Sequence, residues 1–545
     1  MNAGPASSQA QGAGSRSAPS DVTHSSRRWW ALIAIAASVL VVGLDLTVLN
    51  LALPSMAVSL HASTGDLQWI VDSYSLVLAA LILPAGLLGD RYGRKRMLVV
   101  ALILFGAASL ACAYATSTAE LIAARAVLGI GAAAIFPLAL SVLPVLFQQE
   151  ERQRAVAAIA GATMLSFPIG PIVGGYLLDH FWWGSVFLIN VPVVVLAVIA
   201  VLMLLPESRS AVRPSIDLAG MVTSSAGLVA LTYGFIKAGQ DGWSDATAVA
   251  LIAAGAVMLA LLPLVERAVT RRGGQPLADL RLFASPGFRW GTILATLVSF
   301  AMFGLFFALP QYFQDVRGAD AFGSGLRLLP LVGGMLVGMV AGTRLQARRR
   351  STGTAPAGPR SVVTAGYLLM AAAMGLGALT TLASSTGYAL AWVALAGLGL
   401  GLVMPAAMGV ALGALSAERS GAGSALLTAM RQVGSTIGVA VLGTVISNSY
   451  SAGVAGAAAA LPAQAADAVK SSVGAGVAAA HKIGSPSLLG TVQTAFVHGM
   501  DVMLWTCGGI AVGCAVLALL FLPRRMPAGN AGSGDAAEAS PIPVA

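Results

Sequence analysis

The chain of 545 residues is 57% hydrophobic and only 10% charged, and its net charge is +9. Soluble domains carry about 25% charged residues, so this composition excludes a soluble globular protein and predicts one that crosses a membrane many times. The basic residues lie in short segments between apolar runs, which favours positive-inside topology over nucleic-acid binding. Only four of the 31 basic residues are lysines and there are 63 glycines, a bias typical of a GC-rich genome, and we expect a bacterial source.

Apolar runs long enough to cross a bilayer recur along the chain. A hydrocarbon core of about 30 Å needs about 20 apolar residues per helix. The sequence therefore predicts an all-α polytopic membrane protein with fourteen spans. They lie near 30–53, 68–89, 98–116, 119–145, 155–178, 186–205, 217–237, 246–266, 290–313, 324–344, 361–382, 388–412, 424–449 and 499–522.

The remaining segments are polar or low in complexity. Residues 1–28 and 526–545 are expected to be disordered cytoplasmic tails, and 450–498 an external loop or short hairpin. With the N-terminus inside, 24 Lys and Arg residues fall on the cytoplasmic side and five on the external side. This asymmetry predicts both termini in the cytoplasm of a multi-pass protein of the cell membrane.

A repeated pattern predicts how the spans are grouped. Leu128–Pro137 and Leu398–Pro405 both read L-G-x-G followed by proline. Repeated halves with a substrate site between them are a known transporter plan. We therefore expect six-helix bundles at 29–205 and 290–525, with two extra spans and linkers at 206–289. Arg125 precedes the first glycine of its copy by four residues, where the second copy has Leu395.

Few charged residues fall inside the predicted spans. A charge at the centre of a bilayer helix costs about 2.5–3.5 kcal/mol, so each one needs a specific physical role. Asp45 in span one, Asp72 in span two and Arg125 in span four share one outer layer at 1.5 Å per residue, so an acid–base cluster is possible. Such a cluster can take up and release a proton. The alternatives are a static ion pair and, for Asp72, simple contact with external water.

The loop between spans two and three reads G-x-L-x-D-R-x-G-R-K-R over residues 86–96. A basic loop is common beside a membrane span, but this fixed order is specific. In span thirteen, Arg431 can anchor to backbone carbonyls, extend toward the membrane surface, or meet Asp90 of this loop.

Span five contains a run of small residues around a proline. These residues are Gly161, Gly170, Pro171, Gly174 and Gly175. Proline removes a helix hydrogen bond, and glycines permit bending or close helix contact. Ordinary small-residue packing is the alternative interpretation.

Together these segments resemble the fourteen-span drug:proton antiporters of the major facilitator superfamily, over about residues 28–525. The resemblance rests on 45–54, 86–96, 125–131, 170–175 and 431–438. It implies the major facilitator fold, a central drug cavity, and proton coupling by Asp45 and Arg125. It also implies that the glycine-proline run is an antiporter motif. The loop would be a conformational latch, formed by Gly86, Asp90, Arg91, Gly93 and Arg94 with Arg431 as a partner.

One departure concerns span ten. Some members of the family carry an additional acid there, whereas 328–343 contains none, which leaves recognition of divalent cationic drugs in doubt. The aromatic residues of 300–313 are equally compatible with contact to lipid or to ligand.

We expect proton-driven export of amphipathic drugs or antibiotics by a monomer that uses no cofactor and no metal. The chain has no G-x-x-x-x-G-K-[ST], no H-E-x-x-H and no catalytic constellation, which argues against ATP hydrolysis and against an enzyme. Export of one self-made metabolite, proton symport and a non-transporting membrane sensor are the alternatives. The charges inside the spans argue against the sensor.

Overall fold

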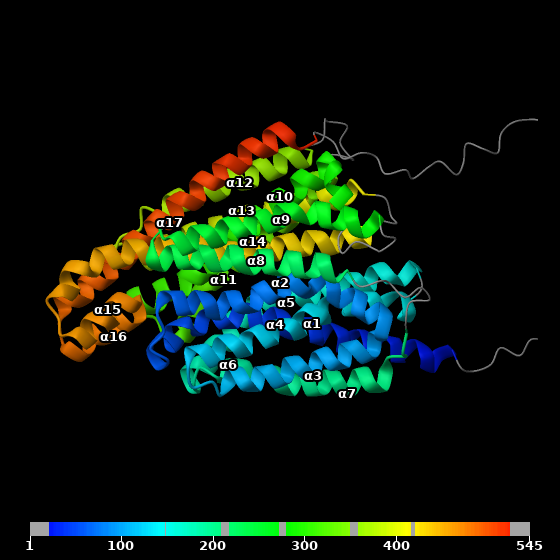
Figure 1. The fold of residues 1–545 in the computed structure, drawn as a ribbon, viewed down its shortest axis with the longest axis horizontal. Helices are drawn as coiled ribbons and strands as arrows, with labels where there is room; N and C mark the ends of the chain where they lie inside the picture. The colour runs from blue at the N-terminus through cyan, green and yellow to red at the C-terminus, as the bar shows by residue number, and fades with distance from the viewer. Residues whose placement is uncertain are drawn as a thin grey trace, which may run out of the picture.

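The structure is a computed structural model that describes residues 21–147, 149–208, 217–242, 244–271, 280–348, 358–415 and 420–523. Within these ranges the regular elements are all helical, and the long helices run roughly side by side (Figure 1). The predicted all-α fold is confirmed. Most of the predicted tails lie outside the described residues, but 21–28 is the first part of a helix, so the expectation of disorder is wrong there.

The first bundle follows the predicted order of spans. Its helices are α1 (Asp21–Ser59), α2 (Thr64–Tyr92), α3 (Arg94–Ala113), α4 (Thr118–Leu146), α5 (Gln149–His180), α6 (Ser185–Leu188) and α7 (Asn190–Leu204). The predicted span 186–205 is thus divided at Ile189 into the short α6 and α7. One hydrophobic core, built mainly between Ala31 and Leu205, holds this bundle together.

The second bundle has a core of its own, built mainly between Leu282 and Leu522. After the short helix η1 (Leu280–Ala284) come α10 (Pro286–Gln311), η2 (Tyr312–Val316), α11 (Ala321–Arg348), α12 (Pro359–Gly377), α13 (Thr386–Gly413), α14 (Ser420–Ala459), α15 (Ala463–Ser471), α16 (Val473–Ile483) and α17 (Pro486–Phe521). The aromatic side chains of Phe306, Tyr312 and Phe313 are buried in this core. They contribute to packing, a role that differs from both lipid contact and ligand contact.

Thirteen of the described helices are long and apolar enough to cross a membrane. The helix α2, which coincides with the predicted span 68–89, is not among the thirteen. Its 29 residues nevertheless pack between α4 of its own bundle and α14 of the other, as a span of this fold does.

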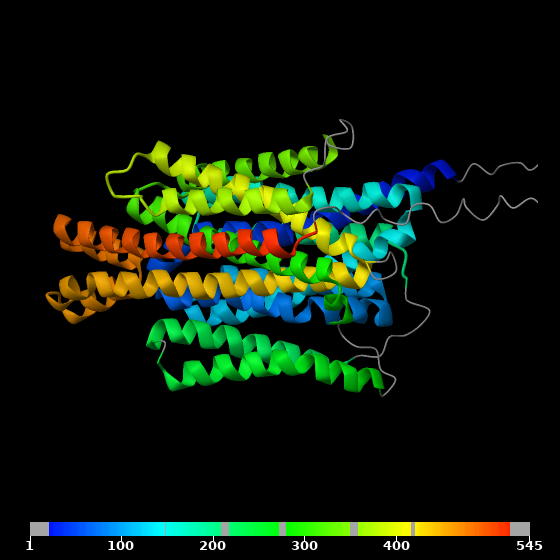
Figure 2. The same ribbon diagram turned by 90° about the horizontal axis from the view of Figure 1, so that it is seen from above.

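The two extra helices form a hairpin outside both bundles. They are α8 (Leu218–Asp241) and α9 (Ala246–Arg271), and they lie to one side of the molecule (Figure 2). The helix α8 packs against α2 of the first bundle and α14 of the second. Trp69 of α2 contacts Tyr233 of α8, with ring centroids 5.5 Å apart. The hairpin therefore contacts the seam between the bundles from outside.

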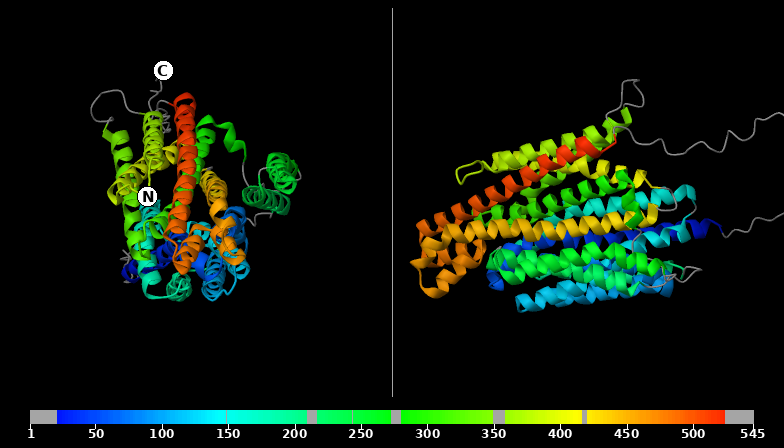
Figure 3. Two further views of the ribbon diagram at one scale, coloured as in Figure 1. Left: turned by 90° about the vertical axis from the view of Figure 1, so that its left-hand side faces the viewer. Right: turned by 45° about the horizontal axis from the view of Figure 1, so that its top comes forward.

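The segment 450–498 is not an open loop: between the ends of α14 and α17 it contains α15 and α16, which pack against each other as a short helical hairpin. Both neighbouring spans are longer than predicted, and α15 and α16 connect them beyond the end of the other helices (Figures 1 and 3). The Tyr450 hydroxyl donates to the carbonyl oxygens of Val469 (2.7 Å) and Ser472 (3.2 Å). Alanine is the best helix former, and Gly484 at φ 69° ends α16 in the left-handed conformation that glycine favours. We call this end of the molecule the α15–α16 end, and the opposite one the Gly93 end.

The structure also corrects the register of the internal repeat. Gly129 and Gly131 of α4 pack against the backbones of α2 and α3. In the second bundle, Gly397 and Gly399 of α13 make the matching contacts with α11 and α12, and Pro405 then matches Pro137. The counterpart of Arg125 is therefore the buried Val393 rather than Leu395, and the cation still belongs to one bundle only.

The orientation of the molecule in the membrane can be tested with single cysteines. We expect Lys482→Cys on α16 to react with a membrane-impermeant maleimide in intact cells, and Arg96→Cys on α3 to react only after permeabilisation. Both positions are exposed, whereas the native Cys112, Cys507 and Cys514 are buried and provide the unlabelled background. The reverse labelling pattern would overturn the cytoplasmic assignment of the Gly93 end.

Candidate functional site

Asp45 and Arg125 form an ion pair inside the first bundle. The helix α1 supplies the acid and α4 the base, and Nη1 of Arg125 lies 2.5 Å from Oδ2 of Asp45. Both side chains are 1% exposed. A buried pair of this kind is held in place by the cost of leaving either charge alone, about 3–5 kcal/mol.

The arginine is fixed from other directions as well. Its Nε donates to the carbonyl oxygen of Ile70 on α2 at 3.0 Å. Its guanidinium carbon lies 4.4 Å from the ring centroid of Tyr74 and 5.9 Å from that of Phe187. An arginine over an aromatic face is attracted by the ring's negative face. Arg125 can therefore keep its position when the charge on Asp45 changes.

Asp72 does not join this cluster. Among the described residues it has no hydrogen-bond partner for either carboxylate oxygen, and its residue is fully buried. The alternative that Asp72 faces external water is therefore wrong. Gln68, one helical turn earlier, donates to the Ala440 carbonyl of α14 at 3.0 Å, so this face of α2 looks toward the second bundle.

The loop of 86–96 is organised around Gly93. This residue has φ 117°, which a residue with a side chain rarely adopts, and it separates α2 from α3. Beyond it, the amide of Arg94 donates to the Ser208 carbonyl at 2.9 Å, and Arg96 forms an ion pair with Glu207 at 3.6 Å. The loop therefore ties α2 and α3 to the segment after α7.

The other latch residues lie near this loop, apart from Arg431. Gly86 approaches Pro137 of α4, and Arg91 lies over the Tyr92 ring. The side chain of Asp90 lies outside the described residues. Arg431 sits in α14, where Nε donates to Ser299 Oγ at 3.3 Å and Nη1 approaches Met408 Sδ at 3.7 Å. In this conformation Arg431 thus contacts its own bundle.

The glycines of α5 permit close packing on both sides of the helix. A Cβ on Gly170 would overlap Thr47 Oγ1 of α1, and one on Gly174 would lie 2.6 Å from Val48 of the same helix. A Cβ on Gly175 would lie 2.6 Å from Cα of Phe322, which belongs to α11. The run Gly170–Gly175 therefore joins α1 to the second bundle. A Cβ on Gly161, the remaining glycine of the predicted motif, would meet no described atom of another helix within 4 Å.

A carboxylate not recognised in the sequence completes this contact between bundles. Oδ1 and Oδ2 of Asp179, near the end of α5, accept hydrogen bonds from the amides of Ala321 and Phe322 at 3.0 Å each. These amides begin α11, where a negative charge is favourable. A Cβ on Gly325, one turn further along α11, would overlap the Pro171 carbonyl oxygen. The bundles are therefore in backbone contact here, toward the α15–α16 end.

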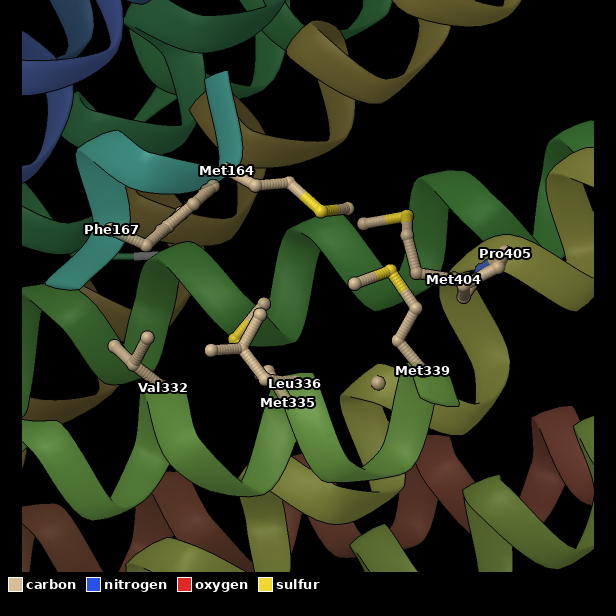
Figure 4. Close-up of a pocket in the computed structure, with 9 residues that line it drawn as sticks. Met164, Phe167, Val332, Met335, Leu336, Met339, Met404 and Pro405 are labelled. Carbon is tan, nitrogen blue, oxygen red and sulfur yellow. The ribbon is translucent and has the colours of Figure 1, made fainter. Parts of the chain in front are cut away.

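A pocket lies between α5, α11 and α13, further from the α15–α16 end than this contact (Figure 4). It holds about 430 Å³ of empty space, including the part that is open to the outside. Met164 and Phe167 line it from α5, Met335 and Met339 from α11, and Met404 from α13. Neither Asp45, Arg125 nor Asp72 reaches it. The pocket thus lies between α5 of the first bundle and α11 and α13 of the second, and its wall is separate from the buried charges.

Comparisons with known proteins match this architecture. The sequence profile described as "Major Facilitator Superfamily" matches residues 35–439. The chain belongs to the major facilitator superfamily. Across 95% of its length it is 33% identical to the Tetracenomycin C resistance and export protein of Streptomyces glaucescens, covering 98% of that protein. The Methyl viologen resistance protein SmvA of Salmonella typhimurium is 31% identical over 90% of this chain and 97% of its own length.

Solved structures share the fold of this superfamily member. A bacterial homologue of the human lysosomal transporter Spinster aligns with a TM-score of 0.65 at 18% identity, over 92% of this chain and 99% of that one. Membership makes the chain a multi-pass membrane transporter and not an enzyme. In the part of the chain that the structure describes, no group of three or more His, Cys, Asp or Glu side chains could hold a metal ion.

The coupling between Asp45 and Arg125 can be tested by measuring how substitutions change the free energy of unfolding. We expect Arg125→Leu to lower the free energy of unfolding by about 3–5 kcal/mol, because it leaves a buried carboxylate alone. Asp45→Leu combined with Arg125→Leu should recover most of that loss, since neither charge remains. Unfolding of the purified protein in mixed micelles measures both values. Equal losses for the single and double variants would contradict a coupled pair.

Proposed function

We propose that this transporter exports amphipathic drugs or antibiotics from the cell in exchange for protons. Family membership and relatives named for resistance and export support the direction of transport. The observation that carries the proton coupling is the buried pair of Asp45 and Arg125 on helices that pack against the pocket wall. No cofactor is needed in this scheme, and the working unit is a monomer.

The pair and the pocket are joined through α1 and α5. Thr47, two residues after Asp45, has its Oγ1 at 3.3 Å from the Ser166 carbonyl oxygen of α5. A Cβ on Gly43 would overlap Ser166 Oγ, so the two helices have no free space between them at this level. Phe167, the next residue of α5, lines the pocket. Movement of α1 must therefore displace the wall that holds the drug.

This linkage suggests how one proton can reset the carrier. A proton on Asp45 removes the charge that Arg125 neutralises, and the arginine retains Ile70 and Tyr74 as partners. The attraction between α1 and α4 then weakens, and α1 can move together with α5. Release of the proton on the opposite side restores the pair. Each step changes the relative stability of two conformations, as alternating access requires.

The contacts between the bundles support an inward-facing state for this conformation in the proposed cycle. With the α15–α16 end outside, the seam at Asp179, Gly175 and Gly325 closes the pocket from the exterior. Gln314 of η2 adds a hydrogen bond of 2.9 Å to the Leu51 carbonyl of α1 at the same end. The pocket would then receive its substrate from the cytoplasm or from the inner leaflet of the membrane.

Asp72 and the loop take separate roles in this proposal. Asp72 is a second carboxylate for proton coupling, placed on the face of α2 that meets the second bundle. The loop of 86–96 and Arg431 are latch parts at the Gly93 end, and they would come together when that end closes. The present contacts of Arg431 with Ser299 and Met408 of its own bundle fit a state in which that end is open.

Loss of the acid tests the proposal. We expect Asp45→Asn to abolish drug tolerance in an efflux-deficient host while expression is retained, because asparagine cannot exchange a proton. The matched control is Asp467→Asn on the exposed surface of α15, which should keep full tolerance. Wild-type tolerance in Asp45→Asn would refute the role of Asp45.

The direction of coupling separates antiport from the alternatives. In everted vesicles with an acid interior, addition of substrate should dissipate the proton gradient, and Asp45→Asn should not respond. Substrate-driven acidification would indicate symport instead. No proton movement with any substrate, together with full tolerance in cells, would contradict proton-driven export.

A further inference from the structure

The pocket between α5, α11 and α13 has an apolar wall that is rich in methionine. Its nine lining residues are methionines, glycine, proline, phenylalanine, valine and leucine, so the wall carries no charge and no strong hydrogen-bonding side chain. Four of the nine are methionines, contributed by three helices (Figure 4). We propose that this pocket binds uncharged, planar aromatic compounds of several shapes, and that it discriminates against compounds with two positive charges. The inference rests on the proposed export function and specifies its substrate class.

The absence of acids from the wall sets the preference for charge. A cation that enters an apolar pocket loses its water and needs a counter-charge in return. The buried acid Asp45 is already paired with Arg125, and Asp72 lies outside the pocket wall. The stretch of α11 that faces the pocket, from Val332 to Met339, contains no acid. Binding of a compound with two positive charges would therefore require desolvation of both charges, and no acid in the wall would offset that free-energy cost.

The shape and polarisability of the wall set the preference for aromatic rings. The α5 and α11 walls face each other across the pocket, which suits a flat ligand between them (Figure 4). Phe167 offers a ring on the α5 side, supported from behind by Phe306 at a centroid distance of 6.2 Å. Thioether sulfurs make favourable contacts with aromatic rings. The pocket thus offers a ring and several sulfurs to a planar ligand.

The methionines also bear on whether the pocket binds one substrate or many. An unbranched side chain with three rotatable bonds can fill gaps of different shape, and promiscuous binding sites use methionine for this reason. Met335 and Met339 lie one helical turn apart on α11, and Met164 and Met404 approach from the other two helices. Such a wall can repack around different planar molecules. This favours broad export over a dedicated exporter of one metabolite.

A ligand series tests the charge preference on the unaltered protein. Equilibrium dialysis of the purified transporter would use acridone (neutral), ethidium (one positive charge) and methyl viologen (two positive charges). We expect the dissociation constant to rise in that order, with methyl viologen at least tenfold weaker than acridone. Methyl viologen binding as tightly as acridone would overturn the proposal.

Substitution of the methionines tests the origin of the breadth. Met335→Ile with Met339→Ile keeps the wall apolar but makes it stiff, because β-branched side chains have few rotamers. We expect the variant to lose at least tenfold in affinity for some members of a set of neutral planar aromatics and little for others, and Met335→Leu with Met339→Leu to lose less. Met203→Ile, at a methionine that is 66% exposed on α7, is the matched control and should change nothing. Unchanged affinities for the whole set in the isoleucine variant would overturn the role of the methionines.

Failure of this inference can be told from failure of the proposed function. Export of methyl viologen in preference to acridone, sensitive to a protonophore, would refute the substrate class and leave proton-driven export intact. Export of acridone that a protonophore does not affect would support the substrate class and refute the proton coupling.

Discussion

The proposed transport cycle depends on the ion pair of Asp45 and Arg125, because loss of either charge raises the free-energy cost of burying the other inside the first bundle. Its members come from α1 and α4, and both are almost completely shielded from solvent. A pair of this kind costs desolvation energy and adds little net stability, so a well-packed apolar pair would serve packing as well or better. The second bundle illustrates the point, since Val393 stands where the repeat aligns with Arg125 and is fully buried. Packing alone therefore gives no reason for the charges, whereas a reversible change of charge does.

In the proposed cycle, closely packed glycines link a local change at this pair to a change at the pocket. The helices α1 and α5 pack so closely at Gly43, Gly170 and Gly174 that a single added carbon would overlap the opposite helix or crowd it. On its other side α5 meets α11 through Gly175 and Gly325. Closely packed surfaces transmit displacement because they cannot be compressed. The glycine-proline run of α5 thus lies at the point where the first bundle, the second bundle and the pocket between α5 and α11 adjoin.

Much of the fold could be predicted from the sequence, because repeated apolar runs of about 20 residues are characteristic of helices that span a bilayer. The residues Asp45 and Arg125 could also be found, since charges inside such runs are conspicuous. Other features depend on tertiary contacts, which a sequence pattern does not contain.

Asp179 was missed because an acid at the end of a span looks like an ordinary surface residue until the amides of Ala321 and Phe322 are seen beside it. The pocket methionines were missed because methionine in a span is indistinguishable from lipid-facing residues. The helices α15 and α16 were missed because alanine- and glycine-rich segments resemble loops in composition, and the repeat register required helix contacts to correct.

The most direct test of the central claim is whether Asp45 itself takes up a proton while it is buried. Infrared difference spectroscopy on the purified, lipid-reconstituted transporter can record the carboxylic-acid carbonyl band that develops as the pH is lowered. We predict a band that is lost in Asp45→Asn and retained in Asp467→Asn, and that shifts when substrate is added. A spectrum of Asp45→Asn identical to that of the wild type would contradict proton uptake by Asp45, because the ion pair would then be a fixed structural element.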